Sequence, residues 1–510
     1  MRSEAERARF GSRVACVYAL RTMETRAAHG ASVALTNLRR PPRRVYATVL
    51  GYAAAAAALG SVALALARGH AIIALMLACL LTICVTAVVR PRAYRLVAWL
   101  GIAALPFATA WAALKPDEYN YPLYLGAFTL LIIGLGALQT GLLPRTAGTL
   151  YLGYILVAGC VSVVTAFGAG GIGRLGYVVT AFGAYVLVHR AGVRERRFLV
   201  TALLAMCAIQ AILSVLQSLV GWPIFPTQLE VLMRSDRNYF AYLVSGASIQ
   251  VVQGSGTFYH FNALGGVLAL AVPIAFGLWL DCLRSPWRLG LFATVLAGTV
   301  TTYSRGALLG ALAGVLFVVI FERSRSRRVM TLLVLCVIVI ASLLALSTAS
   351  QYYETTQNVG IRAETWRMAA VDALNQPSNL LFGYGYDHFH SEVLSTNSSG
   401  TGRAVRSTVM SSLHSGPLQL ALEFGVVGVI LFALWIIAAF RAGLGSGRSR
   451  LTVALLGGAV AFLCHQAIDT SLFLFPGVLF AVVIGLAEAE AKATASALVD
   501  TRDDAHRDRR

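Results

Sequence analysis

The chain has 510 residues, of which 57% are hydrophobic and only 13% are charged, and its mean hydropathy is +0.71. A soluble domain carries about 25% charged residues because its surface must face water, so the composition excludes an ordinary soluble protein. The net charge is +19. A basic chain can bind nucleic acid, but we attribute the charge to membrane topology and to attraction to anionic lipid. We therefore expect membrane lipid, and no nucleic acid, as a partner.

The apolar residues occur in blocks of about 20, long enough for an α-helix to cross a bilayer core of roughly 30 Å. A β-barrel would need strands of alternating apolar and polar residues, and that alternation is absent from the sequence. We therefore predict an all-α, polytopic integral membrane protein with about 12–14 transmembrane helices. The predicted spans are 45–67, 70–89, 94–114, 121–140, 147–167, 172–190, 198–220, 260–281, 288–303, 304–321, 329–347, 415–440, 450–466 and 470–487.

The spans and the segments between them define five regions. These are a basic cytoplasmic tail (1–44), an N-terminal transmembrane bundle (45–347), a large exoplasmic loop (348–414), C-terminal transmembrane helices (415–487) and a cytoplasmic tail (488–510). The first tail is either a segment that lies on the membrane surface or an over-extended N-terminus, in which case the true start of the protein lies nearer Met23. We expect the polar tail 488–510 to be disordered.

Charge predicts the orientation of the spans, because cytoplasmic loops are enriched in Lys and Arg. With the N-terminus inside, most of the 42 Lys and Arg residues fall on the cytoplasmic side. The clusters responsible are Arg39–Arg44, Arg90–Arg95, Arg190–Arg197, Arg323–Arg328 and Arg441–Arg450. The sequence therefore predicts that both termini are cytoplasmic.

Two exoplasmic segments, 221–259 and 348–414, are longer than the other connections, and such loops are usually functional or disordered. Within the second, the stretch 359–375 has helical spacing of apolar residues. We predict a helix there that lies on the membrane surface. Pro377 and the glycines of 382–389 (FGYGYDHF) are expected to end it in turns.

No metal or cofactor site is apparent in the sequence. The eight cysteines lie in spans, at span ends or in the N-terminal tail, so we expect no structural disulfide. No Cys/His spacing resembles a zinc site, and neither a P-loop nor a dinucleotide fingerprint is present. We therefore expect no metal and no cofactor.

Polar residues from distant parts of the chain are predicted to meet at the outer ends of the spans. An ionisable residue at or within the membrane is costly, which makes it a functional candidate. The candidates are the segment 254–262 (GSGTFYHFN), the corner Tyr303–Gly306, Arg362, His414, Glu423, His465 and Asp469.

Arg305 lies where two predicted spans meet in a tight hairpin, and Gly306 and Gly310 would allow close helix approach. Its side chain could extend to phospholipid headgroups. Alternatively, its guanidinium could bind a diphosphate with paired hydrogen bonds.

His414 precedes a span, beside Ser415. A lone histidine is often a packed core residue, but an imidazole at this interface could take a proton from a hydroxyl near neutral pH. Glu423 could orient His414 or pair with an arginine. His260 and Asn262 form either a polar cluster at a helix start or, with Tyr303, part of a substrate-binding surface. His465 and Asp469 could fix an outer turn.

Four motifs occur in the order seen in the O-antigen ligase/polymerase superfamily, which the chain resembles over about residues 250–430. They are GTFYHFNALGG (256–266), TTYSRGALLGAL (301–312), RAETWRMAA…PSNLLFGYGYDHF (362–389) and LHSGPLQLALEFGVVG (413–428). Two positions differ from the family pattern. Ser415 stands where the family usually has Asn, and Phe261 where it usually has Pro.

The resemblance implies a metal-independent glycosyltransferase at the outer face of the plasma membrane. Its donor would be a glycan on a polyprenyl diphosphate, and its acceptor a glycan, glycolipid or protein. By position, His414 matches the family's essential histidine, Arg305 the arginine of the SRGA motif, and Arg362 the arginine that opens the loop helix. Arginines would stabilise the departing diphosphate, and His414 would deprotonate the attacking hydroxyl.

Three functions stay open from the sequence. The first is transfer of a lipid-linked glycan to an acceptor by a ligase. The second is a polymerase that joins lipid-linked repeat units at the same site. The third is a transporter or flippase, which should show inverted repeats and charged, broken spans near the bilayer midplane. The predicted spans are nearly free of charge, which argues against transport.

Overall fold

The computed structural model describes segments that all lie in the unit Pro91–Arg510. The described residues are 99, 101–102, 144–166, 169–220, 239–244, 247–258, 261–322, 366–367, 370–371, 374, 377–385, 415–445, 448–468, 472 and 475–507. The tail 1–44, the predicted spans 45–67, 70–89, 121–140 and 329–347, and nearly all of 94–114 lie outside them.

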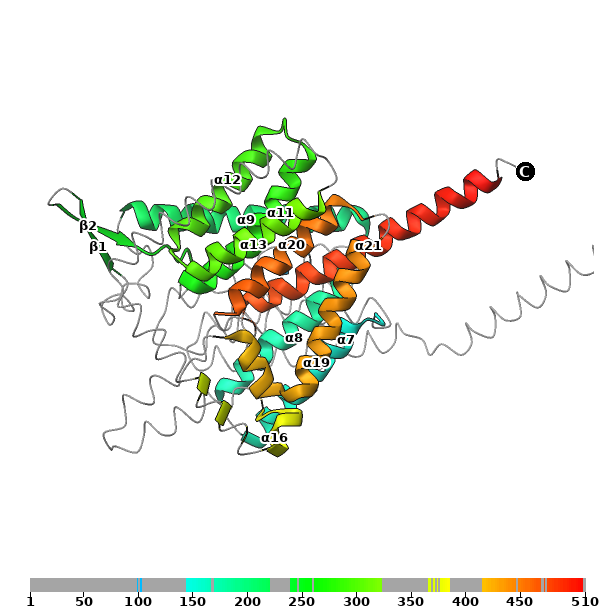
Figure 1. Cartoon of the computed structure of the whole chain (residues 1–510), viewed down its shortest axis with the longest axis horizontal. Helices are drawn as coiled ribbons and strands as arrows, with labels where there is room; N and C mark the ends of the chain where they lie inside the picture. The colour runs from blue at the N-terminus through cyan, green and yellow to red at the C-terminus, as the bar shows by residue number, and fades with distance from the viewer. Residues whose placement is uncertain are drawn as a thin grey trace, which may run out of the picture. The chain divides into compact units, whose positions relative to one another are not determined.

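Helices dominate the described part of the chain (Figure 1). They are α7 (Ala147–Ala166), α8 (Ala169–His189), α9 (Val193–Val220), α11 (Phe261–Asp281), α12 (Pro286–Thr301), α13 (Arg305–Phe321), α16 (Pro377–Phe382), α19 (Gly416–Leu444), α20 (Arg450–Gln466) and α21 (Phe475–Arg507). Apart from the short α16, each corresponds to one predicted span.

The apolar helices confirm the all-α membrane class. Among the described helices, α9, α11 and α19 are long and apolar enough to cross a membrane, and α13 and α20 are shorter apolar helices. Large apolar side chains such as Leu219 and Val220 on α9 are mostly exposed, as expected of a surface that contacts lipid rather than water.

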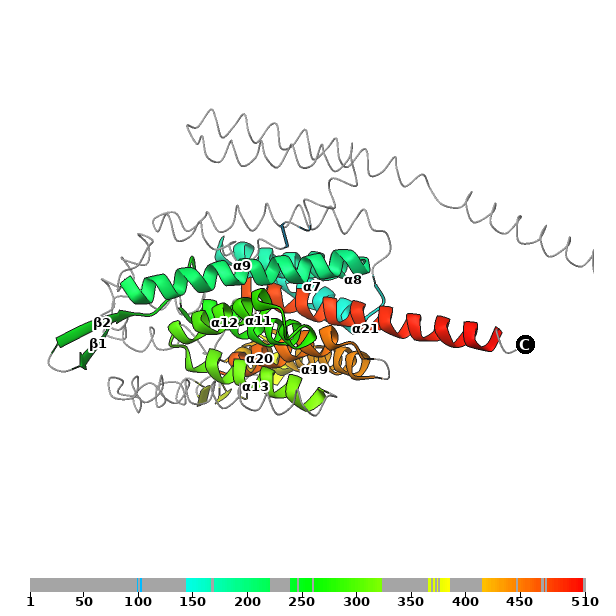
Figure 2. The same ribbon diagram turned by 90° about the horizontal axis from the view of Figure 1, so that it is seen from above.

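α11 lies at the centre of the packing, against α12, α13 and α20 (Figures 1 and 2). Almost every residue along α11 is buried. Small residues let the neighbouring helices approach closely, which is how membrane helices associate without a hydrophobic driving force. A Cβ added to Gly310 of α13 would lie 2.3 Å from the Ala461 carbonyl oxygen of α20. α13 and α20 therefore pack almost backbone to backbone.

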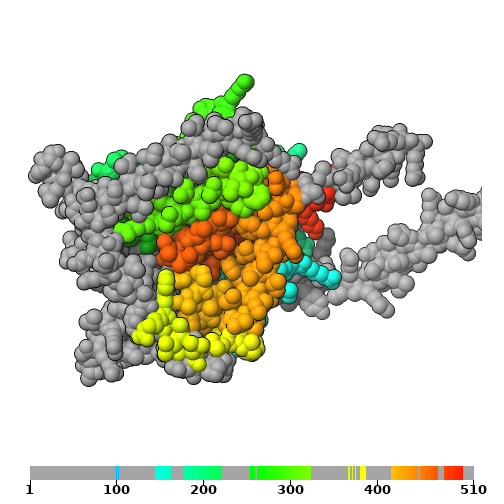
Figure 3. Space-filling model, in the orientation of Figure 1, coloured from blue at the N-terminus to red at the C-terminus, as the bar shows by residue number. Residues whose placement is uncertain are grey.

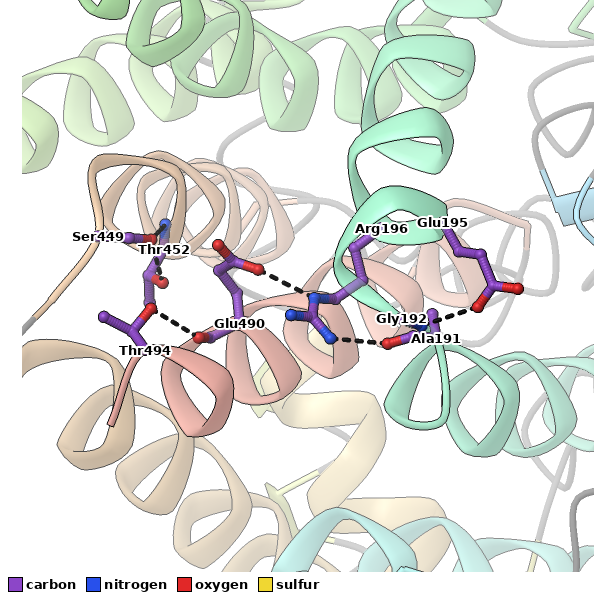
Figure 4. Close-up of polar contacts among 8 residues, drawn as sticks. All are labelled: Ala191, Gly192, Glu195, Arg196, Ser449, Thr452, Glu490 and Thr494. Carbon is purple, nitrogen blue, oxygen red and sulfur yellow. Dashed lines mark hydrogen bonds and ion pairs between the residues drawn. The ribbon is translucent and has the colours of Figure 1, made fainter. Parts of the chain in front are cut away.

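Ion pairs join helices at the end of this bundle that lies away from Arg305. Arg450, at the start of α20, bonds to Glu322 at 2.9 Å and to Asp281 at 2.7 Å. Arg196 of α9 bonds to Glu490 of α21 at 2.9 Å (Figure 4). A charge removed from water needs a partner of this kind, and these pairs fix the helix ends relative to one another.

A β-hairpin interrupts the predicted loop 221–259. Strand β1 (Tyr239–Val244) pairs antiparallel with β2 (Ala247–Val252), and Tyr239 lies opposite Val252. Both strands are rich in aromatic and β-branched residues, which favour extended structure. The hairpin is the exception to the helical character of the described segments.

The prediction that 488–510 is disordered is wrong for its described part, because α21 continues as a helix to Arg507 (Figure 1). The sequence AEAEAKATASAL that follows the apolar part contains no Gly or Pro and many strong helix formers. Extending an existing helix costs little compared with nucleating a new one, so the polar residues simply prolong α21.

The predicted surface helix 359–375 lies partly within the described residues. The described residues Trp366, Arg367, Ala370, Val371 and Leu374 are all helical. After them α16 begins at Pro377, and Gly383 and Gly385 follow with φ of 83° and 96°. These left-handed glycines form the turns that the sequence predicted.

Candidate functional site

Four segments that are far apart in the sequence meet at one end of the bundle. The N-terminal part of α11 contacts the start of α13, since a Cβ on Gly265 would lie 3.0 Å from the Ser304 Cβ. The start of α13 contacts the end of α20, where a Cβ on Gly306 would lie 3.2 Å from the His465 ring. The end of α20 in turn contacts the start of α19, where Gly416 packs on Gln466. Figure 3 shows α13, α20 and α19 side by side on one face.

The corner between α12 and α13 fixes the position of Arg305. Tyr303 has a φ of 52°, the one positive value among the described non-glycine residues. Ser304 caps α13, and its hydroxyl accepts a hydrogen bond from the Ala307 N–H at 3.4 Å. The buried Thr302 hydroxyl accepts one from the Ser304 N–H at 3.3 Å. Arg305 is therefore the first residue of α13, half-buried and preceded by a tightly bonded turn.

Glu423 lies next to a break in α19. The helix loses its helical dihedral angles at Gly425, where φ is 65° and ψ is −170°. The Glu423 side chain is 2% exposed and accepts a hydrogen bond from the Gln419 amide at 2.9 Å. A buried carboxylate thus lies where a long apolar helix is interrupted, and non-helical backbone at membrane depth is tolerated only when its polar groups are satisfied within the protein.

The turn after α16 supplies donors to that break. The Tyr384 N–H donates to the Leu422 carbonyl at 2.8 Å, and the Gly385 N–H donates to the Glu423 carbonyl at 3.1 Å. The Tyr154 hydroxyl of α7 donates to the Phe424 carbonyl at 2.9 Å. The turn after α16, within the large loop, is therefore bonded to the interrupted part of α19 (Figure 1).

The polar segment 253–258 is held by side chains of α9 that sequence reasoning missed. Gln217 accepts hydrogen bonds from the N–H groups of Ser255 and Gly256 at 2.9 and 2.8 Å. Gln210 accepts one from the Thr257 N–H at 2.9 Å. The signal was available, since Gln210, Ser214 and Gln217 recur at helical spacing within an otherwise apolar span.

The structure describes four of the seven predicted site residues: Arg305, Tyr303, Asn262 and Glu423. Asn262 lies in the first turn of α11, in the element that contacts the Ser304 corner. His414, Arg362 and His260 lie outside the described residues, as does Asp469. Ser415, the residue after His414, is the N-cap residue of α19, and Gly416 contacts Gln466 at the same end of the bundle.

His465 is fully buried at the end of α20. Its Nδ1 lies 3.1 Å from the Gln466 amide nitrogen, and its ring lies beside Gly306. Within the described segments, no group of three or more His, Cys, Asp or Glu residues is placed to hold a metal ion. The polar groups of the described part of this site are hydroxyls, amides, imidazole, one carboxylate and one guanidinium.

The fold and this gathering of polar side chains define an α-helical integral membrane protein with a candidate site at one end of its bundle. Residues 289–433 match a family model described as O-antigen ligase. The matched region runs from α12 into α19, and the match is consistent with a member of the O-antigen ligase superfamily. That family implies a glycosyltransferase-like enzyme that uses lipid-linked glycans in general. No curated protein matches the chain.

Proposed function

We propose that the protein transfers a glycan from a polyprenyl (undecaprenyl) diphosphate carrier to an acceptor hydroxyl at the outer face of the plasma membrane. The observation that carries the proposal is the meeting of three helix starts at one end of the bundle. α13 begins at Arg305, α19 begins just after His414, and the first turn of α11 contains Asn262. The match of residues 289–433 to the O-antigen ligase family supports the same class of reaction.

Stabilisation of the leaving group is the role that we assign to the arginines. A glycosyl diphosphate is already activated, so its departure needs positive charge more than a strong acid. Arg305 would bind diphosphate oxygens through two parallel N–H donors, and Arg362 would add a second guanidinium. Fixed charges in a poorly hydrated site usually supply the largest part of such catalysis.

Deprotonation of the acceptor is the role that we assign to His414. The acceptor oxygen bonds to the anomeric carbon while the bond from that carbon to the diphosphate oxygen breaks. The electron pair leaves with the diphosphate, and the hydroxyl proton passes to the imidazole. Glu423 would orient His414 or the substrate, and Asn262, His260 and Tyr303 would contact the sugar or the diphosphate.

Ligase and polymerase activities would share this site and differ only in the acceptor. The experiment that separates them uses the purified full-length protein in lipid nanodiscs with lipid-linked glycans extracted from the cells that make it. One reaction contains a candidate acceptor that is not lipid-linked, and the other contains the donor alone. A ligase gives a glycosylated acceptor and free polyprenyl diphosphate only in the first reaction.

Two other outcomes would assign a different function. Longer lipid-linked glycans in the reaction without the acceptor would assign a polymerase. An unchanged donor in both reactions would reject glycan transfer. If the protein in proteoliposomes then moved the donor across the membrane, it would be assigned as a transporter.

A further inference from the structure

A row of polar side chains runs along one face of the apolar helix α9. Gln210, Ser214 and Gln217 are spaced by four and three residues, which places them on the same face. All three are at most 1% exposed. Burying an amide in an apolar environment is unfavourable unless it is hydrogen-bonded, so the partners of these side chains explain why α9 carries them.

Gln217 bonds to the backbone of the segment that leads into α11. Its carbonyl oxygen accepts from the Ser255 N–H at 2.9 Å and the Gly256 N–H at 2.8 Å, and its amide donates to the Gly256 carbonyl at 2.8 Å. One side chain thus satisfies three backbone groups of adjacent residues. It replaces the partners that a strand or helix would otherwise supply.

Gln210 holds the next residue in the same way. Its carbonyl oxygen accepts from the Thr257 N–H at 2.9 Å, and its amide donates to the Thr257 hydroxyl at 2.7 Å. Gly256 has a φ of 56°, and a Cβ there would lie 2.4 Å from the Gln210 amide oxygen. The segment is shaped to bring its backbone against these two glutamines.

The same segment is also tied to the α12–α13 corner. The Gly254 N–H donates to the Thr301 carbonyl at 2.9 Å, and the Ser214 hydroxyl lies 3.0 Å from the Thr301 hydroxyl. Thr301 precedes Arg305 by four residues, and Thr257 precedes Asn262 by five. α9 therefore fixes the position of the segment that leads to Asn262 relative to the corner that leads to Arg305.

We infer that Gln217 and Gln210 are positioning residues of the glycan-transfer site, which set the placement of the Asn262 segment relative to Arg305. This inference rests on the proposed function. Neither glutamine contacts the reacting atoms in this account; they act through the backbone of 255–257. A misplacement of about 1 Å that arises away from the chemistry can lower a rate by about 100-fold, which is the effect that loss of the glutamines should produce.

The test compares Gln217→Met and Gln210→Met with the control Cys207→Ala, all as full-length protein in nanodiscs. Methionine keeps the length and apolar packing of glutamine but removes its hydrogen bonds. Cys207 is buried on α9, one turn before Gln210, so its truncation reports the effect of disturbing the packing of α9 while both glutamines stay in place. Two quantities are measured: transfer kinetics with the extracted lipid-linked donor, and amide hydrogen exchange of peptides covering 253–258.

We expect kcat to fall at least about tenfold in both glutamine variants, with a smaller change in KM. Exchange at 255–257 should become faster in these variants and stay unchanged in Cys207→Ala, which keeps its activity. Faster exchange with unchanged kcat would overturn the inference, as would unchanged exchange. Failure of both glutamine variants to accumulate as folded protein would assign the glutamines to folding and overturn it too. An inactive wild-type protein would instead count against the proposed function.

Discussion

Arg305 begins α13 at a position where the backbone leaves little freedom. The preceding Tyr303 is held at a positive φ, and Ser304 and Thr302 satisfy N–H groups on either side of the guanidinium-bearing residue. A side chain that starts from a fixed backbone loses less conformational freedom when it binds a ligand. This setting suits a guanidinium that must meet a diphosphate in one geometry.

Arg305→Lys separates diphosphate binding from anchoring to phospholipid. An ammonium keeps the charge but loses the two-pronged donor geometry, so we expect transfer to fall by about 100-fold while the protein still accumulates in membranes. The measurement is the initial rate of acceptor glycosylation, normalised to the amount of folded protein. A Lys variant with wild-type activity would favour the headgroup anchor.

The transfer reaction is expected to continue in the presence of EDTA. The proposal assigns charge stabilisation to guanidinium groups and proton transfer to an imidazole, and neither role needs a divalent cation. The measurement is the transfer rate before and after chelation and dialysis. Activity that disappeared with EDTA and returned with magnesium or manganese would contradict this assignment.

At the residue scale, the sequence offered candidate residues for the chemistry but did not predict the side chains that hold their segments in place. Arg305, Asn262 and Glu423 were identified because polar residues at the ends of apolar spans are conspicuous. Gln210 and Gln217 were missed because they lie in the interior of a span, and their bonds go to backbone groups some forty residues further along the chain. Such partners depend on tertiary structure, which spacing alone does not reveal.

At the element scale, the break in α19 is the feature that most changes the site. An uninterrupted helix would occupy the carbonyls of Leu422 and Glu423 with its own N–H groups. The break frees them for the Tyr384 and Gly385 N–H groups, so the turn after α16, within the large loop, is bonded beside Glu423. The interruption thus joins the loop to the helix that begins directly after His414.

Gly425→Ala should disrupt this arrangement. With φ at 65° and ψ at −170°, the residue adopts a conformation that is essentially restricted to glycine, and a Cβ would lie 2.4 Å from the Leu381 carbonyl oxygen. We expect a loss of stability of at least about 1–3 kcal/mol and reduced transfer. The apparent unfolding temperature, measured at one scan rate, reports the first effect.

Gly153→Ala is the matched control for that variant. Gly153 lies within α7, and a Cβ there meets nothing within 4 Å. Alanine in a helix interior is favoured over glycine by about 1 kcal/mol, so this variant should be at least as stable as the wild type. Equal stability and activity of the two variants would show that the break at Gly425 is not required.

The sequence predicted the described helices well and the interruption of α19 poorly. Apolar blocks predicted α7, α11, α13 and α20 nearly to the residue because a bilayer demands continuous apolar stretches. The break at Gly425 lies within one such block, and it depends on donors from the distant turn at 383–385.

At the scale of the whole molecule, the two ends of the described bundle differ in chemistry. One end gathers the Arg305 corner, Asn262 and the start of α19. The other carries the ion pairs of Arg450 and Arg196 with acidic residues. This difference parallels the charge bias of the sequence, in which the ends predicted to be cytoplasmic are rich in arginine.

Reporter fusions test the predicted orientation. A reporter fused after Arg328 should be cytoplasmic, and one inserted near Ser399 should be exoplasmic, because the arginine clusters favour the inner side. Paired alkaline phosphatase and fluorescent protein fusions measure both positions. The reverse labelling would place the Arg305 end of the bundle on the cytoplasmic side and contradict transfer at the outer face.

The most direct test of the proposed function is glycan transfer by purified wild-type protein and by His414→Ala in nanodiscs, with extracted lipid-linked donor and an acceptor. Mass spectrometry measures both the glycosylated acceptor and the released polyprenyl diphosphate. We predict both products from the wild type and neither from the variant, which should still accumulate and remain folded because His414 precedes the first residue of α19, Gly416. A fully active His414→Ala variant would contradict the assignment of His414 as the base that starts the reaction.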